Sequence, residues 1–354
     1  MDVEIVGGSF AGLACARTCA DRGLETVVWE RKRDVGEAVH TTGILVQEVA
    51  DAEDLPTDAL RRVSGVRLYG PSLGWIDLET PGYAFFATDT AAILRAYADA
   101  ARSAGAELRL GRTHRGERTG RMLVGADGPR SRVARANGLG RNRAFLTGVE
   151  AEFVGEVAIE QRLHVFLDSA LAPGYIGWVV PGVGVTQVGV AARHPARPDL
   201  DRFARHIAPV VDLTRAARVG RRGGSIPVGG RVKRFASEDV VLVGDAAGLV
   251  SPLTGGGIHT ALSSGRAAGL AIAAYLADGG PPPAVALERA YPRFAVKRAL
   301  RVGIDLRPPN ALLDAAIETS ALRVLAKLVF FHHRGLLSAE AWRAMVGSRG
   351  PRAG

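Results

Sequence analysis

Apolar and polar positions over the first thirty residues follow a strand, turn, helix, strand pattern. The run "VEIV" predicts a buried strand over 3–6, "GGSFAG" a glycine-rich turn over 7–12, "LACARTCADRG" a helix over 13–23, and "ETVVWE" a second strand ending at Glu30. This order predicts a βαβ unit, the building block of doubly wound α/β folds.

The middle of the chain changes to shorter alternating runs. Residues 61–89 carry Gly and Pro between short apolar stretches, which predicts antiparallel strands. A helix is expected from about Thr90 to Ala104, with Gly105 as its C-cap. The runs "AELRL" and "RMLVGADG" predict two further strands, the second of them buried.

The second half repeats this change of pattern. Residues 145–230 are β-rich and glycine-punctuated, with at most one helix near 199–218. A buried strand, "DVVLVGD", then leads to a long small-residue helix from about Gly256 to Ala277, and "DGGPPPA" separates it from helical segments that run to the end. The chain therefore leaves the nucleotide-binding domain for a sheet domain twice.

The amino-acid composition limits the kinds of partner that the chain is expected to bind. With 47% hydrophobic and 23% charged residues the chain is ordinary globular protein. The formal net charge of +9 comes almost entirely from arginine, without a run of like charges or a basic face interleaved with aromatics. We therefore expect no nucleic-acid partner, whereas a basic surface facing anionic lipid stays open.

The two cysteines, Cys15 and Cys19, fall on one face of the first predicted helix. We interpret them as small core residues, because no His/Cys cluster completes a metal site, and no metal is expected. Thiols without a disulfide pattern, and a start that runs straight into a strand, favour a cytoplasmic location. The most apolar stretches are shorter than the ~20 residues of a membrane span, so at most a peripheral membrane contact is expected.

The first motif, "GGSFAG", carries Ser9 where a second glycine is usual in G-x-G-x-x-G. Gly7 is expected to make the tight turn and Gly12 to allow close packing of helix on strand, while the helix N-terminus offers N–H groups to a pyrophosphate. Glu30, at the end of the second strand, can accept both ribose hydroxyls. The alternative is a structural turn with a surface glutamate.

Two further motifs specify the cofactor. "GADGPRS" at 125–131 follows a buried strand, and "VGDAAGLVSPLTGGGIHTALSSG" from 243 places Asp245 at a strand end before a turn, Gly255 to Gly257, that opens a helix. The acid can bind a polyol hydroxyl, and the helix N-terminus can stabilise negative charge on a reduced flavin. A nicotinamide enzyme needs no such element, so the three motifs together predict FAD.

These elements predict an α/β protein with a doubly wound, Rossmann-type FAD-binding domain, an inserted antiparallel-sheet substrate domain and a helical C-terminus. The expected divisions are 1–60, 89–144 and 232–279 for the FAD-binding domain, 61–88 and 145–231 for the sheet domain, and 280–354 for the C-terminal segment.

The motifs resemble those of the glutathione-reductase-type FAD fold with the "DG" motif of flavin monooxygenases. The resemblance to the geranylgeranyl reductase family extends further, to about residue 300. The segment "GVRLYGPSLGWIDLETPGYAFFATD" is similar to the family's first sheet segment, and "PGYIGWVVPGVGVTQVGVAA" resembles its Tyr/Trp/Pro signature. "GGSIPVGG", followed by the third motif, resembles its flavin-closing segment.

The resemblance and the motifs imply a set of residues around FAD. These are Gly7, Gly8, Ser9, Phe10, Ala11, Gly12, Glu30, Arg31, Thr41, Thr42, Thr90, Asp127, Gly244, Asp245, Pro252, Gly255, Gly256, Gly257 and Ile258, with the backbone of His114 near the adenine. The chain departs from the family where "VHTTG" has Thr41 at the position of a cysteine near the isoalloxazine, where Thr90 replaces an arginine, and where 111–121 is short for the usual hairpin.

Four side chains are candidates for chemistry and substrate binding. His40 can be a proton donor or a solvated loop residue, and Thr41 can bond flavin N5 or the substrate, or fill the volume of the cysteine. Tyr175 and Trp178 can line an apolar substrate channel or form sheet core. The segment 309–346, which includes His332 and His333 on the polar edge of an amphipathic helix, can touch a membrane surface, although packing against the sheet is expected for most of it.

The resemblance implies a flavin-dependent reductase that saturates carbon–carbon double bonds of an isoprenoid or similar apolar chain, with NAD(P)H or another reductant as electron donor. A class A flavin monooxygenase acting on an aromatic or polyketide shares all three motifs and is the alternative, and a non-catalytic FAD-bound scaffold is a third class. The sequence predicts nothing about oligomeric state.

Overall fold

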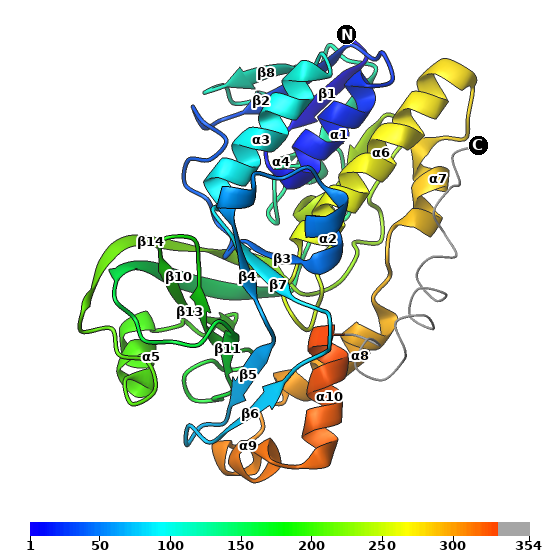
Figure 1. Ribbon diagram of the computed structural model, residues 1–354. Coiled ribbons are helices and arrows are strands. Elements are labelled where there is room, and N and C mark those ends of the chain that lie inside the picture. Colours follow the sequence, from blue (N-terminus) through cyan, green and yellow to red (C-terminus); the bar gives the residue numbers. More distant parts are fainter. Residues whose placement is uncertain (332–354) are drawn as a thin grey trace.

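The computed structural model describes residues 1–331, so His332, His333 and the last part of the 309–346 and 280–354 segments lie outside the described residues. Two large sheets, one above the other in Figure 1, are joined by a small third sheet and flanked by the C-terminal helices. The architecture is mixed α/β, with a Rossmann-type FAD-binding unit, a largely antiparallel sheet unit and a helical C-terminus.

A five-stranded, fully parallel sheet has the order β15-β9-β1-β2-β8. Its strands are β1 (Val3–Val6), β2 (Thr26–Glu30), β8 (Glu107–Leu110), β9 (Met122–Gly125) and β15 (Val240–Leu242). Helices α1 (Phe10–Ala20), α3 (Thr90–Ser103) and α6 (Ile258–Asp278) lie side by side across it (Figure 1). The short apolar strand runs are buried because helices and loops cover the sheet, as parallel sheets require.

Two predictions from the sequence concern the helices packed on this sheet. The predicted βαβ unit is confirmed, but α1 begins at Phe10, three residues before the expected start, so the "GGSFAG" motif already contains the first turn of the helix. Helix α3 is as predicted: Asp89 caps it by accepting the Ala92 N–H, and Gly105 follows it with a positive φ of 103°. Cys15 and Cys19 are fully buried in α1, as expected of core residues.

A seven-stranded sheet has the order β14-β10-β13-β12-β11-β5-β6. Its strands are β5 (Val66–Tyr69), β6 (Trp75–Leu78), β10 (Phe145–Gly155), β11 (Leu163–Phe166), β12 (Gly177–Pro181), β13 (Thr186–Arg193) and β14 (Ala216–Pro227). The expectation of an antiparallel sheet is wrong for one pair, because β5 and β11 are parallel. They come from the two separate excursions of the chain, and each excursion is antiparallel only within itself.

One helix, α5 (Leu200–Ile207), packs on this sheet and buries Leu200, Phe203 and Ile207. It is shorter than the predicted 199–218, because the chain turns after Ile207 and is strand β14 from Ala216.

A three-stranded sheet, β3-β7-β4, connects the two large sheets (Figure 1). Its strands are β3 (Ile44–Val46), β4 (Leu60–Val63) and β7 (Phe85–Thr88). Four short helices complete this half of the fold: α2 (Gln47–Ala52), α4 (Arg132–Ala136) and the 3₁₀ helices η1 (Thr57–Ala59) and η2 (Gly244–Ala247). None of the four was predicted, because one or two turns are too short to show helical periodicity.

The C-terminal segment forms α7 (Pro283–Ala290), α8 (Ala295–Asp305), α9 (Asn310–Ile317) and α10 (Ser320–Phe331). Phe331 is fully buried against Tyr83 and Phe85, with ring centroids 5.8 and 5.6 Å away. Packing against the sheet is therefore confirmed for the described part of this segment. Within residues 1–331, no helix has the length and apolarity needed to cross a bilayer.

Candidate flavin site

The start of helix α1 is shaped to hold an anion. Ser9 is its N-cap, with extended backbone, and the Ser9 side chain makes no capping hydrogen bond. The N–H groups of the first turn are therefore available to a ligand, together with the positive end of the helix dipole.

Glycines bring this turn close to the sheet. A Cβ on Gly12 would lie 1.9 Å from the Gly7 carbonyl oxygen, and a Cβ on Gly7, whose φ is 112°, would lie 2.3 Å from the Ala126 oxygen. Both contacts are to backbone, which cannot move aside. The predicted roles of Gly7 in the tight turn and of Gly12 in close helix–strand packing are confirmed.

Glu30 is buried at the end of β2, and the alternative of a surface glutamate is wrong. Its Oε2 accepts the Gly8 N–H at 2.7 Å and its Oε1 accepts the Lys32 N–H at 2.9 Å. The carboxylate is thus fixed beside the glycine turn, and each oxygen keeps a lone pair for a ribose hydroxyl.

The first and third motifs meet next to this turn. A Cβ on Gly244 would lie 2.9 Å from the Ala11 Cβ, so η2 abuts the start of α1. Asp245 follows, and its Oδ1 would lie 3.5 Å from a Cβ on Gly257, the N-cap of α6. Burial raises the pKa of Asp245 to about 6. The structure therefore places a carboxyl, a glycine-lined helix start and an anion cradle side by side.

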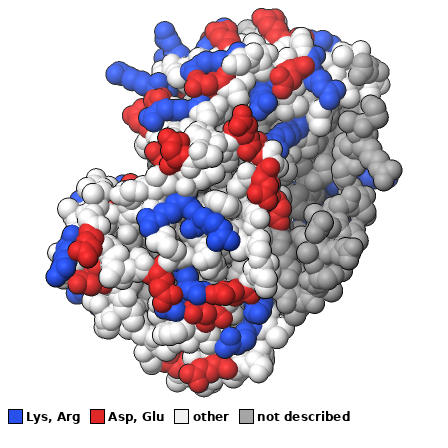
Figure 2. Space-filling view, viewed as in Figure 1, with Lys and Arg blue, Asp and Glu red and all other residues white. Residues whose placement is uncertain are grey.

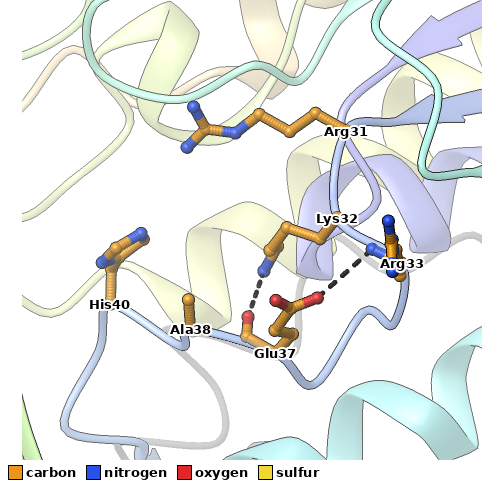
Figure 3. Close-up of a pocket in the computed structure, with 6 residues that line it drawn as sticks. All are labelled: Arg31, Lys32, Arg33, Glu37, Ala38 and His40. Carbon is orange, nitrogen blue, oxygen red and sulfur yellow. Dashed lines mark hydrogen bonds between the residues drawn. The ribbon is translucent and has the colours of Figure 1, made fainter.

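The segment after β2 lines an open pocket of about 450 Å³ (Figure 3). Arg31, Lys32, Glu37 and His40 are among the lining residues, and Arg31 extends over the opening toward His40. The Lys32 ammonium donates to the Glu37 carbonyl oxygen at 2.8 Å, which holds the two sides of the segment together. His40 is exposed at this pocket, so its imidazole is accessible to solvent and to a ligand.

A buried polar cluster joins the loop after His40 to the seven-stranded sheet. Glu150, on β10, accepts from the Thr42 hydroxyl at 2.5 Å and from the Trp178 indole N–H at 2.7 Å through Oε2. Its Oε1 accepts from Arg222 Nε on β14 at 2.7 Å. We call Thr42, Glu150, Trp178 and Arg222 the Glu150 cluster.

Sequence reasoning missed Glu150 and Arg222. The signal was present, because Leu146, Gly148 and Glu150 occupy alternate, inward-facing positions of β10, and a charge on an inward face needs a partner. We predicted that Trp178 lines a substrate channel or forms sheet core. In the structure its indole N–H donates to Glu150 within this cluster.

Tyr175 lies beside the glycine turn before α6. Its hydroxyl donates to the Thr254 carbonyl oxygen at 2.5 Å, and a Cβ on Gly255 would approach that hydroxyl to 2.5 Å. Arg301 of α8 donates to the Gly174 carbonyl oxygen at 2.5 Å and to the Pro252 carbonyl oxygen at 3.4 Å. The C-terminal helices therefore brace the turn on which the third motif depends.

Comparison with known proteins identifies the family. The FAD binding domain family matches residues 85–285, and the NAD(P)-binding Rossmann-like domain family matches residues 5–52. Digeranylgeranylglycerophospholipid reductase 2 of Methanopyrus kandleri is 30% identical, with 76% of each chain covered. Menaquinone reductase of Mycolicibacterium smegmatis is also 30% identical, over 97% of this chain and 95% of that relative.

The chain belongs to the geranylgeranyl reductase family of FAD-dependent oxidoreductases. FAD is its cofactor. A geranylgeranyl bacteriochlorophyll reductase-like protein from Thermoplasma acidophilum has a TM-score of 0.80 over 98% of both chains at 22% identity, and so shares the fold.

Two candidate side chains, Asp127 and Thr90, make hydrogen bonds within the protein. Asp127 accepts from the Ser131 hydroxyl at 2.6 Å and from the backbone N–H groups of Arg132 and Val133, and so caps α4. Thr90 is buried and pairs with the Thr88 hydroxyl at 2.9 Å. Both side chains are thus engaged within the protein, and their roles toward FAD stay predictions.

Both ring nitrogens of His114 are also engaged within the protein: Nε2 lies 3.1 Å from the buried Glu4 carboxylate, and Nδ1 accepts the Gly116 N–H at 3.3 Å. Only its backbone is left for an adenine, which is how the sequence placed it. The Glu4 carboxylate also accepts the Thr119 and Gly120 N–H groups at 2.7 Å and thereby fixes the short 111–121 segment.

The raised pKa of Asp245 gives a testable pH dependence. A hydroxyl of the cofactor donates more strongly to an ionised carboxylate than to a neutral carboxyl, so FAD binding favours the ionised form. The affinity of apoprotein for FAD should therefore fall as the pH drops through about 6, by about fivefold to tenfold between pH 7 and pH 5. Fluorescence titration at each pH measures it.

Asp245→Asn is the matched control, because an amide does not titrate. The variant should bind FAD more weakly at pH 7 and with the same affinity at pH 5 and pH 7. A wild-type affinity that is flat over this range would mean that Asp245 does not contact FAD.

Proposed function

We propose that this protein is a reductase that uses reduced FAD to saturate carbon–carbon double bonds in the isoprenoid chain of a lipid. The observation that carries the proposal is the 30% identity over nearly the full length to a menaquinone reductase, together with the match to digeranylgeranylglycerophospholipid reductase. Both names denote lipids with a polyisoprenoid chain and a polar head.

The geometry around the predicted flavin position supports this proposal. The Tyr175 hydroxyl and the Trp178 indole N–H both donate within the protein, so these two side chains offer a ligand mainly their ring surfaces. Tyr175, Trp178 and Ile226 pack together beside Leu146 and Val228. Such a surface suits an apolar chain and excludes water from it.

In the proposed reaction each residue has a separate task. When bound and reduced, FAD supplies a hydride to one alkene carbon. Glu30, the α1 N-terminus and Asp245 would hold the cofactor, and Trp178 and Tyr175 would align the chain. A proton must reach the other alkene carbon, and His40 is our candidate donor, because it is exposed at the pocket beside Thr41 and can be reprotonated from solvent.

An anaerobic experiment tests the proposal. FAD-loaded protein reduced with dithionite should add two hydrogens per reduced double bond to a geranylgeranyl glycerophospholipid or a polyprenyl quinone, detected by mass spectrometry. Dithionite replaces the natural donor, which can be NAD(P)H or another reductant, so the test does not depend on its identity. An FAD-free sample prepared in the same way is the control.

The alternative function, a class A monooxygenase, gives the opposite pattern. NADPH oxidation would accelerate when substrate is added in air, oxygen would enter the product, and no double bond would be saturated without oxygen. That result would replace the proposed reductase by the monooxygenase.

A further inference from the structure

A second cavity lies where the chain leaves the five-stranded sheet and enters β10. Its volume is about 260 Å³, and four arginines line it: Arg130, Arg135, Arg141 and Arg143. Phe145 and Asn142 are also part of the lining, and no carboxylate side chain is. Four guanidinium groups around one small cavity make it strongly electropositive.

These four arginines lack the carboxylate partners that many arginines of residues 1–331 have. On the face drawn in Figure 2, many of the Lys and Arg side chains lie next to Asp or Glu side chains. Arg67, for example, bonds Asp77 at 2.8 Å and Glu160 at 2.7 Å. Within residues 1–331, by contrast, none of the four cavity arginines forms an ion pair. All four are exposed, so solvent screens part of their mutual repulsion, and a bound anion would remove more of it.

Asp127, two residues before the lining residue Pro129, makes its bonds elsewhere. Asp127 directs both carboxylate oxygens to Ser131 and the start of α4, as described above. Arg130 stacks on Phe145, with its guanidinium carbon 4.7 Å from the ring centroid, and its NH2 group lies 3.4 Å from the Ser225 hydroxyl. The stacking fixes the Arg130 plane without using its hydrogen-bond donors, which suits recognition of an anion.

The cavity is tied to the flavin site by two links. Asn142 donates to the backbone carbonyl oxygens of Asp245 at 2.8 Å and Pro129 at 3.0 Å, so its wall is continuous with the second and third motifs. On the sheet side, Ser225 follows Gly224, and a Cβ on Gly224 would lie 3.8 Å from the His40 Cβ. An anion held here would belong to a molecule able to reach the flavin.

We propose that this arginine cavity binds the phosphate of a phosphorylated ligand and so anchors that ligand beside the flavin. Guanidinium groups match phosphate oxygens in bidentate geometry, and a dianion would neutralise charges that no carboxylate neutralises. Two sources have this chemistry: a nicotinamide dinucleotide that delivers electrons, and the head group of a phospholipid substrate. The proposed anion site does not depend on the proposed function. Only the choice between the two sources of the phosphate rests on the proposed function.

Binding of pyrophosphate to FAD-loaded protein, measured by calorimetry at low salt, tests the site independently of turnover. Arg135→Gln should weaken pyrophosphate binding about tenfold, because it removes one charge-assisted contact. Arg132→Gln is the matched control, since Arg132 lies in the same helix, is exposed and does not line the cavity. Absence of saturable binding to the wild type, or equal weakening by both substitutions, would overturn the proposal.

Two kinetic arms then separate the sources, using the Arg135→Gln/Arg141→Gln/Arg143→Gln protein. The first arm measures KM for NADPH in flavin reduction, which should rise if the ligand is a dinucleotide. The second arm uses dithionite as reductant and compares KM for a phospholipid substrate with KM for a polyprenyl quinone. If the ligand is a dinucleotide, the ratio of these two KM values stays as in wild type. If the ligand is a lipid head group, that ratio rises instead. Pyrophosphate binding by this triple variant at wild-type affinity would overturn the site, whatever the reductase assay shows.

Discussion

Replacing Glu150 with Gln should lower the free energy of unfolding by about 3 kcal/mol, because it breaks a buried ion pair and leaves the Arg222 guanidinium next to a neutral amide. Glu150 is 3% exposed and the Arg222 side chain 17%, so water compensates little. Glu152 lies 3.0 Å from Arg222 and remains as a partial partner. The expected loss of stability is therefore at the lower end of the range for breaking a buried ion pair. Urea unfolding of the apoprotein measures the change.

Glu107→Gln is the matched control. Glu107 and Arg109 bond at 2.7 Å with side chains 56% and 36% exposed, so losing that pair should change stability by less than about 1 kcal/mol. In a double-mutant cycle, Glu150→Gln with Arg222→Met should cost less than the sum of the two single changes, because no unpaired charge is left. Equal stability of the Glu150→Gln and Glu107→Gln proteins would show that the cluster is not coupled as its geometry indicates.

The Glu150→Gln substitution should also affect the candidate flavin site, because Glu150 binds Thr42. The Thr42 hydroxyl and the Trp178 indole share the Oε2 oxygen of Glu150, so the carboxylate orients the loop that carries His40 and Thr41. Glu150→Gln should therefore shift the fluorescence of bound FAD and lower kcat more than it raises KM. Glu107→Gln should do neither, and a purely structural role for Glu150 would leave the flavin spectrum of the folded variant unchanged.

The parts of the site that the sequence predicted are those built from local backbone geometry. Gly7, Gly12 and Glu30 lie within one strand–turn–helix–strand unit, whose spacing alone fixes where each atom must be. Asp245 and Gly257 belong to a second unit, in which strand β15 and a turn lead into helix α6. That the two units meet at Ala11 and Gly244 follows from the parallel sheet, in which strand ends gather at one edge.

The parts that were missed depend on contacts distant in sequence. Thr42 and Glu150 are 108 residues apart, and Glu150 and Arg222 are 72 apart, so no local pattern pairs them. The parallel β5–β11 pair is a similar case, because alternation predicts a strand but not the direction of its neighbour. Asp127 and Thr90 matched motif positions, yet Asp127 caps α4 and Thr90 packs under the Gly43 loop, which only the folded chain reveals.

The contact between α1 and α6 ties the two ends of the cofactor cradle together, and it depends on Gly265, the last residue of the third motif, to which the sequence analysis gave no role. A Cβ on Gly265 of α6 would lie 2.2 Å from the Ala11 carbonyl oxygen, inside the helix whose start forms the anion cradle. This neighbour is backbone and cannot rotate away. Gly303 of α8 gives the opposite case, because nothing lies within 4 Å of the position of its Cβ.

Gly265→Ala should therefore lower the free energy of unfolding by about 3 kcal/mol, the upper range for overpacking a core, whereas Gly303→Ala should raise it by up to about 1 kcal/mol through helix propensity. The two substitutions add the same methyl group to a helix, so urea unfolding of the two variants compares packing with propensity directly. Because the displaced atom belongs to the α1 turn at the cofactor, Gly265→Ala should also weaken FAD binding at least tenfold, and Gly303→Ala should leave it unchanged. A Gly265→Ala protein that is destabilised but binds FAD normally would show that α6 can shift without moving the start of α1, and that the cradle is held by the β1–α1 turn alone.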